Sequence, residues 1–137
     1  MKRIIIDTNF LMIPWLYKVD IFSEFNRICN FSYKLYIYEQ SIAELRSIIE
    51  NQSKHKRAAQ TALKLIKLKN IEMIKSEAGD VDSLILENLA KDTIAAADTI
   101  VATQDKELRQ KLLKKGTSVI VLRQKKYLEL VEMMNSS

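Results

Sequence analysis

Four acidic side chains of this 137-residue chain stand where an α/β fold would bring them together. Asp7 ends the apolar run that opens the sequence, MKRIII, and Asp105 follows the apolar run TIVAT. Glu44 lies about one turn into the helix expected after KLYIY, and Asp82 lies in the first turn of a later one. In an open parallel sheet, ligands bind beyond the carboxyl ends of the strands. These four positions are therefore candidates for one site.

Such a cluster would favour one kind of chemistry. Neighbouring carboxylates repel one another and have raised pKa values unless a cation binds them. Ligands that are all oxygen favour Mg²⁺ or Mn²⁺ over zinc. The sequence has no His/Cys zinc set, no Ser–His–Asp arrangement and no glycine-rich phosphate loop, and its single histidine, His55, stands in the basic run KHKR. If the chain is an enzyme, the carboxylates and a metal ion must carry the chemistry.

Each acid also has an ordinary structural role to be weighed. Asp80 is better interpreted as the cap of the helix that contains Asp82. Asp105 could equally cap the helix that follows it, and Glu44 could be a solvated helix position. Asp7 is the hardest to explain in this way, because an unpaired charge at the end of a buried strand is energetically expensive.

The elements that must position these residues alternate regularly along the chain. Strands are expected at 3–6, 34–38, 71–74, 99–103 and 118–122, the last strand. Helices are expected at 19–28, at 39–50, from Ser53 as a cap to about 69, from about 81, at 106–115 before Gly116, and at 126–134. Residues 11–17, with Pro14, are expected to be an irregular apolar connection. The order predicts a three-layer α/β fold: a single domain, 1–137, with a mainly parallel sheet of about five strands and helices on both faces.

Composition fits a soluble protein and excludes few functions. No apolar stretch is long enough to cross a bilayer, and the N-terminus lacks a secretory signal, so we expect a cytoplasmic protein without a membrane partner. The lone cysteine, Cys29, cannot form an internal disulfide and is expected in the core. A net charge of +5 gives weak support for a polyanionic partner, since basic proteins of many kinds exist.

Four segments in order resemble a PIN domain: IIIDTNFLM, the acid in SIAELRSI, the helix VDSLILENLA, and IVATQDKELRQKL. The resemblance covers the chain from Arg3 to the last expected strand. It implies an endoribonuclease that needs Mg²⁺ or Mn²⁺ and cleaves single-stranded RNA. The catalytic and metal-binding acids of the family match Asp7, Glu44, Asp82 and Asp105. The polar residues beside the first and last acids match Thr8 or Asn9, and Thr103.

One departure affects the third acidic motif. Many relatives have two acids in tandem there, whereas Ser83 follows Asp82 in this chain. Asp80 offers a substitute acid at a different spacing, so it could replace or join Asp82 as the third ligand.

Contacts to RNA outside the acids are expected from positive charge. Two basic runs could hold phosphates, or could equally be solvated surface: Lys54, Lys56 and Arg57, and Arg123, Lys125 and Lys126. Tyr17 or Trp15 could stack a base or contact another subunit, but packing beneath the first loop is the expected role of Trp15.

The biological role has two interpretations within the resemblance. The chain resembles archaeal PIN proteins akin to ribosome-processing nucleases, and it equally resembles the VapC toxins of toxin–antitoxin pairs. The implied partners are single-stranded RNA, an antitoxin protein or ribosome-assembly factors, and a second copy in a homodimer. The apolar segment FLMIPWLY gives the homodimer some support.

Three other readings have different requirements. A phosphoaspartate receiver domain would need an acidic pair after the first strand and an aspartate after the third. An aspartate phosphatase would need D-x-D where Asn9 takes the second acidic position. A non-catalytic PIN-like RNA-binding scaffold in ribosome assembly is the more serious alternative, because of the departure at Ser83.

Overall fold

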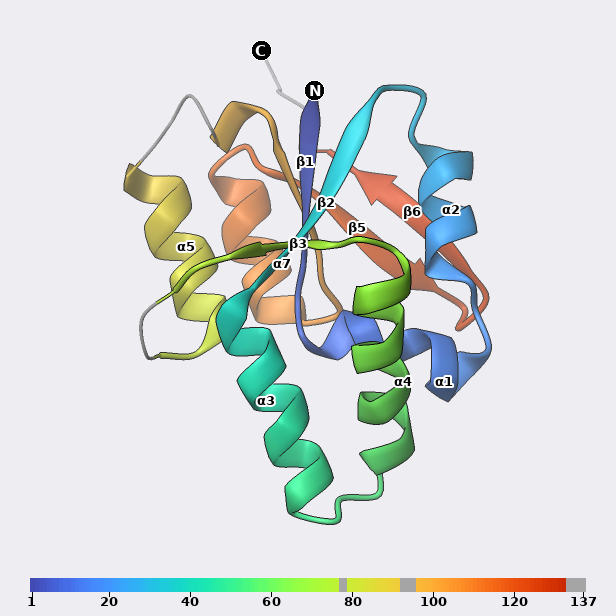
Figure 1. The fold of residues 1–137 in the computed structure, drawn as a ribbon. Coiled ribbons are helices and arrows are strands. Elements are labelled where there is room, and N and C mark those ends of the chain that lie inside the picture. Colours follow the sequence, from blue (N-terminus) through green and yellow to red (C-terminus); the bar gives the residue numbers. More distant parts are fainter. Residues whose placement is uncertain (77–78, 92–95, 133–137) are drawn as a thin grey trace.

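A computed structural model describes residues 1–76, 79–91 and 96–132, in which six strands form one sheet (Figure 1). The strands are β1 Lys2–Ile6, β2 Tyr33–Tyr38, β3 Glu72–Ile74, β4 Thr99–Ala102, β5 Ser118–Arg123 and β6 Tyr127–Val131. Their order across the sheet is β3-β2-β1-β4-β5-β6. All neighbours are parallel except β5 and β6, which are antiparallel. The strand that ends in Asp7 is therefore central.

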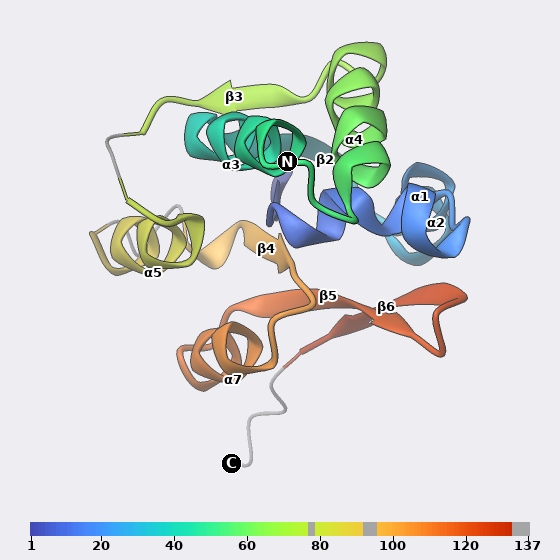
Figure 2. The same ribbon diagram turned by 90° about the horizontal axis from the view of Figure 1, so that it is seen from below.

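Helices cover both faces of this sheet, which gives the predicted three layers. They are η1 Asn9–Met12, α1 Ile13–Tyr17, α2 Ile21–Ile28, α3 Glu39–Glu50, α4 Lys56–Leu68, α5 Val81–Lys91 and α7 Lys106–Lys114. Alternate residues of β1 face opposite sides, as the pleat of a strand requires. Ile4 and Ile6 pack with η1, α1, α2, α3 and α4, and Ile5 packs with α5 and α7. Figure 2 shows these two groups of helices on either side of the sheet.

The helix predicted at 126–134 is wrong over its described part, because Tyr127–Val131 forms β6. Leu128 is buried while Tyr127 and Glu129 are exposed, which is the alternation of a strand. Gln124 and Lys125 have φ values of 52° and 55°, so they form a tight turn of the kind that joins hairpin strands. The sheet thus has six strands rather than about five, and 118–122 is not the last; residues 133–134 lie outside the described residues.

Two smaller predictions are also corrected. Residues 11–17 are helical rather than irregular, with Pro14 in the first turn of α1, where its missing N–H costs nothing. Ser53 does not cap α4, because its hydroxyl accepts the N–H of His55 in the turn before that helix. The predicted bounds of α3 are confirmed, as is Gly116 after α7, with φ of 83°.

The segment FLMIPWLY packs mainly into the core. Residues 10–13 are buried, and these would have been the apolar surface offered to a second copy. Trp15, in contrast, keeps 38% of its surface exposed, so the prediction that it packs beneath the first loop is wrong. Cys29 is buried, as predicted. Among the described residues, every helix is too short or too polar to span a membrane.

The hairpin β5–β6 is anchored to α2 by two charged side chains. The N–H of Leu128 donates to Oε1 of Glu24 at 2.9 Å, and its carbonyl accepts from Arg27 at 3.0 Å. Arg27 Nε also donates to Glu24 at 2.8 Å. Because β6 lies at the edge of the sheet, this pair satisfies backbone groups that have no neighbouring strand.

Replacing Glu24 with alanine should therefore destabilise the protein by about 2 kcal/mol, because a backbone donor loses a charged acceptor. Glu129→Ala is the matched control, since it also breaks an arginine–glutamate pair on β6 but holds no backbone group. That exposed pair should contribute less than about 0.5 kcal/mol. Urea denaturation of both variants measures the difference, and equal losses would contradict the anchoring role.

Candidate active site

Asp7 lies at the carboxyl end of β1 with only 4% of its surface exposed. Its Oδ1 accepts the backbone N–H of Thr8 at 2.8 Å, and its Oδ2 accepts the hydroxyl of Thr103 at 2.8 Å. Its own N–H donates to the carbonyl of Ala102 in the adjacent β4. Across the described chain, no lysine, arginine or histidine forms a salt bridge with it. Burial raises the pKa of Asp7, and its two hydrogen bonds only partly offset this.

Asp82 is in the first turn of α5, and it lies close to two other acids. Burial, followed by the negative charges of Asp7 and Asp105, raises the pKa of Asp82 to about 7. The carboxyl group of Asp82 is close enough to both of them to interact with each. The structure therefore brings Asp7, Asp82 and Asp105 together.

Asp105 lies near these acids and also caps a helix, the role that the sequence analysis considered for it. Its Oδ1 accepts the N–H of Leu108 at 3.0 Å, which caps α7. Its backbone N–H donates to the hydroxyl of Thr103 at 3.0 Å. Thr103 thus joins the ends of β4 and α7 to Asp7, because the same hydroxyl donates to that carboxylate.

Glu44 approaches from α3, on the other side of Asp7. The hydroxyl of Thr8 donates to its Oε1 at 3.1 Å and lies 2.9 Å from the hydroxyl of Ser41. Burial first, and the charges of Asp7 and Asp80 after it, raise the pKa of Glu44. Electrostatic interactions therefore link Glu44 to Asp7, and Asp7 to Asp82 and Asp105, at one edge of the sheet, where β1 and β4 end and α3, α5 and α7 begin (Figure 2).

The polar residues around the acids have different roles. Thr8 holds Asp7 through its backbone and Glu44 through its side chain, whereas Asn9 is exposed. Ser41 is fully buried beside Thr8 and was missed by the sequence analysis. Its place one turn before Glu44 in the same helix was the available signal. Asp80 caps α5 by accepting the N–H of Ser83 at 2.8 Å, as expected.

The carboxylate oxygens of these acids are the kind of ligand that a hard divalent cation prefers. A small cavity of about 110 Å³ lies beside Asp82 and Asp105. Within the described ranges, no group of three or more Asp, Glu, His or Cys side chains is placed so that it could hold a metal ion. Mg²⁺ does not need such a group, since it retains several waters and often uses only one or two carboxylates. A larger hollow of about 690 Å³ between α3, α4 and β3 contains none of the four acids.

The two predicted basic runs lie away from these acids. Lys54, Lys56 and Arg57 lie where α3 connects to α4, at the far tip of that helical pair (Figure 1). Arg123, Lys125 and Lys126 lie at the turn between β5 and β6. Arg123 is paired with Glu129 at 3.1 Å. Neither run neutralises the acidic site.

The family model described as "PIN like domain" matches residues 4–125. This chain belongs to the PIN-like domain family. Over 135 residues it is 35% identical to Ribonuclease VapC4 of Methanocaldococcus jannaschii, a match that covers 98% of this chain and 100% of that protein. The structure titled "Structure of the PIN domain endonuclease Utp24" has a TM-score of 0.76 at 21% identity, covering 93% of this chain and 90% of the other.

These comparisons confirm the resemblance and the fold that were inferred from the sequence. The PIN-like fold delivers the carboxyl ends of β1 and β4 and the first turns of α3, α5 and α7 to the same edge. Its acidic positions lie there without a basic partner among the described residues.

The raised pKa of Asp82 predicts how stability depends on pH. Its folded value of about 7 lies above its ordinary value of 3.8, so the folded state binds the proton more tightly. Without divalent ions, the free energy of unfolding should fall as the pH rises from about 4 to about 7. Asp82→Asn should remove much of this decline. Because solvent screens the half-buried group, we expect a gain of only about 3 °C in Tm at about pH 8.

Thermal melts in a chelator at several pH values would measure this effect. Asp98→Asn is the contrasting control, because this exposed carboxylate is paired with Lys2 before β4 and lies away from the acidic site. It should leave the decline in stability with rising pH unchanged. A wild-type Tm that rises from about pH 5 to about pH 8 would contradict the proposed repulsion among the acids.

Proposed function

We propose that this PIN-like chain is an endoribonuclease that requires Mg²⁺ or Mn²⁺ and cleaves single-stranded RNA. The observation that carries the proposal is the set of converging carboxylates at the edge of the sheet, with a pKa of about 7 at Asp82. Such a set is costly unless a cation is to be bound. The names of the archaeal ribonuclease and of the endonuclease with the same fold support the reaction class.

Asp7 would be the central metal ligand. Glu44 and Asp82 would complete the coordination directly or through water, and Asp105 would hold a second ion or orient the attacking water. When bound, the ions offset negative charge on the phosphodiester and make a coordinated water more acidic. All four acids would then act as catalytic and metal-binding residues.

The residues around the acids have positioning roles. Thr8 and Thr103 each donate one hydrogen bond to Asp7, so its carboxylate plane is fixed before a cation arrives. Each oxygen of Asp7 keeps further lone-pair capacity for a ligand. Asp82, with its pKa near 7, would release its proton when a cation replaces it. The basic runs at 54–57 and 123–126 would attract RNA from outside this site.

We infer the biological role from the ribonuclease that is 35% identical to this chain. Its name, Ribonuclease VapC4, supports a role as the toxin of a toxin–antitoxin pair, with an antitoxin protein as partner. Processing of ribosomal RNA, with assembly factors as partners, is the other role implied by the sequence resemblance. Purification with the product of the neighbouring gene would distinguish the two. The single domain over 1–137 and the homodimer stay predictions.

Replacing Asp7 with asparagine should reduce cleavage of single-stranded RNA by at least about a hundredfold, because even partners outside the ligand shell typically contribute 10–100-fold. Asp98→Asn is the control: this aspartate is exposed and paired with Lys2 at the opposite edge of the sheet. Gel assays with Mg²⁺ or Mn²⁺ and calorimetry with Mn²⁺ measure the two losses. If Asp7→Asn cleaves RNA as fast as wild type, the site assignment is wrong. Intact RNA binding by a wild-type chain that neither binds Mn²⁺ nor cleaves would favour the non-catalytic scaffold.

Thr103 offers a test of positioning. Thr103→Val keeps the shape of this fully buried side chain but removes the hydroxyl that joins Asp7 to the backbone of Asp105. We expect cleavage and Mn²⁺ affinity to fall about 10–100-fold. Thr103→Ser retains the hydroxyl and should restore most of both. Equal behaviour of the two variants would show that packing, and not the hydrogen bond, is what matters.

A further inference from the structure

Three lysine–aromatic contacts gather around α1 and the start of α2, a region that we call the α1–α2 face. The ammonium groups lie 3.9, 5.3 and 5.7 Å from the ring centres in the pairs Lys18–Trp15, Lys69–Phe22 and Lys125–Tyr17. The lysines come from three places in the chain: the end of α1, the end of α4 and the β5–β6 turn. The fold therefore brings three lysines to this region, where Trp15 is the exposed ring, Tyr17 is half-buried and Phe22 is buried.

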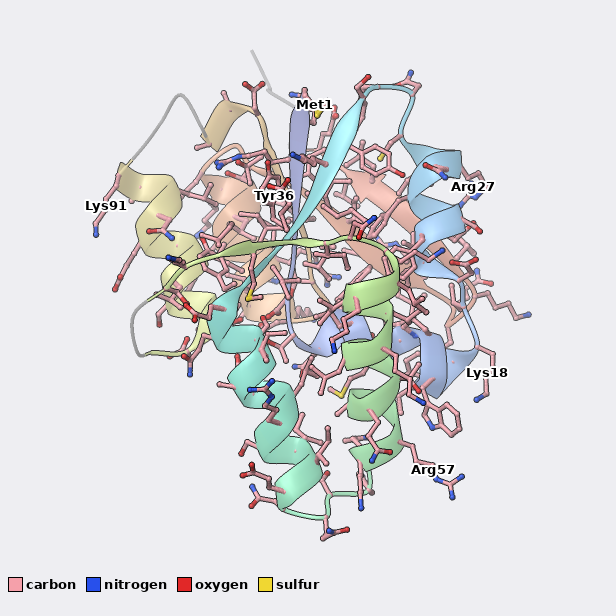
Figure 3. All side chains as sticks on the ribbon, in the orientation of Figure 1. Met1, Lys18, Arg27, Tyr36, Arg57 and Lys91 are labelled. Atoms are coloured by element: carbon pink, nitrogen blue, oxygen red, sulfur yellow. The ribbon has the colours of Figure 1, made fainter. Side chains whose placement is uncertain are left out.

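This face adjoins the acidic site through a short helical segment. Only η1 and the first turn of α1 separate Asp7 from Trp15. Figure 2 shows η1 leading from the middle of the molecule to α1 at its rim. Figure 3 shows Lys18 and Arg57 on this same side of the molecule. A chain of nucleotides held at the acids could continue across this surface.

Trp15 is the exposed member of an otherwise buried segment. Residues 10–13 lie in the core, while Trp15 keeps 38% of its surface accessible beneath the amine of Lys18. One partly exposed ring offers far less apolar area than a stable dimer needs. An accessible aromatic ring next to basic side chains is instead a usual means of binding single-stranded nucleic acid.

A hollow of about 380 Å³ lies between α1, α4 and the start of α2, and Pro14, the residue before Trp15, is part of its lining. Lys18 and Lys69 line it together with the apolar side chain of Leu65. Asp20 also lines it, but its carboxylate accepts the N–H groups of Phe22 and Ser23 and caps α2. The two amines therefore remain the groups suited to a phosphate, and the rest of the hollow suits a ribose or base.

We propose that the α1–α2 face binds the stretch of single-stranded RNA that flanks the segment held at the acids, with one base stacked on Trp15 and phosphates contacting Lys18, Lys69 and Lys125. This proposal rests on the proposed ribonuclease function and extends it to a second RNA contact. A base would replace or sandwich the lysine that covers the ring in the free protein. Stacking on the ring accepts any base, so this contact would add affinity with little sequence preference.

The sole tryptophan of the chain makes the contact directly observable. The full chain is titrated, in a chelator that prevents cleavage, with a mixed-sequence single-stranded RNA labelled for anisotropy. Tryptophan emission and anisotropy should change together, with the same Kd. Repeating the titration with Asp7→Asn in place of the chelator should give the same result.

Variants separate stacking from charge. Trp15→Leu should weaken RNA binding about tenfold, the loss expected for one stacked base. Lys18→Gln should reduce the slope of log K against log salt by about 0.7, the value for one phosphate on a single strand. Lys114→Gln has the same change in charge on the exposed last turn of α7 and should leave that slope unchanged. Circular dichroism checks that each variant is folded.

Three results would overturn the proposal. Normal RNA binding with unchanged tryptophan emission would show that RNA binds outside the α1–α2 face. Cleavage of RNA by the wild type would still support the proposed ribonuclease function. No RNA binding by anisotropy would also exclude it, and the separate cleavage assay would then decide the proposed function. Emission that depends on protein concentration without RNA, with a dimer mass in sedimentation, would assign the face to a second copy of the chain.

Discussion

The structure depends on one buried carboxylate that two neighbouring threonines hold by hydrogen bonds. Asp7 lies at the end of the central strand, and its oxygens accept a backbone N–H from Thr8 and a hydroxyl from Thr103. These bonds connect the ends of β1 and β4, and Thr103 extends the connection to α7 through Asp105. Burial without a positive partner still raises the pKa of Asp7, so the scaffold must tolerate an unfavourable group at its centre.

That tolerance comes from the layers on either side. The isoleucines of β1 pack into a separate apolar cluster on each face of the sheet. The four parallel pairings of the sheet fix the positions at which its strands end. Rigid packing can therefore hold acids closer together than their charges would favour. The carboxylates destabilise the folded protein by repelling one another only while no cation is bound, because a divalent ion would attract all of them.

The sequence predicted those parts of the molecule in which local pattern and global fold agree. Apolar runs that end in Asp7 and Thr103 marked buried parallel strands, and strand ends of this kind meet at one edge. It failed at 126–134, where apolar residues fit a helix as well as a strand and the turn contains neither glycine nor asparagine. Ser41 was missed because only the tertiary contact with Thr8 gives it a role. The exposure of Trp15 depended on the helical course of residues 11–17, which had been expected to be irregular.

The separation of charges in this PIN-like chain has a functional logic. An anionic cluster repels phosphates, and the described basic side chains form no salt bridge with its acids. Attraction for RNA must then come from basic side chains elsewhere on a chain of net charge +5. A bound cation would offset the repulsion between the acids and a phosphodiester. Placing lysines and an exposed ring at the rim, and uncompensated carboxylates at the centre, leaves the centre free for the proposed metal ion.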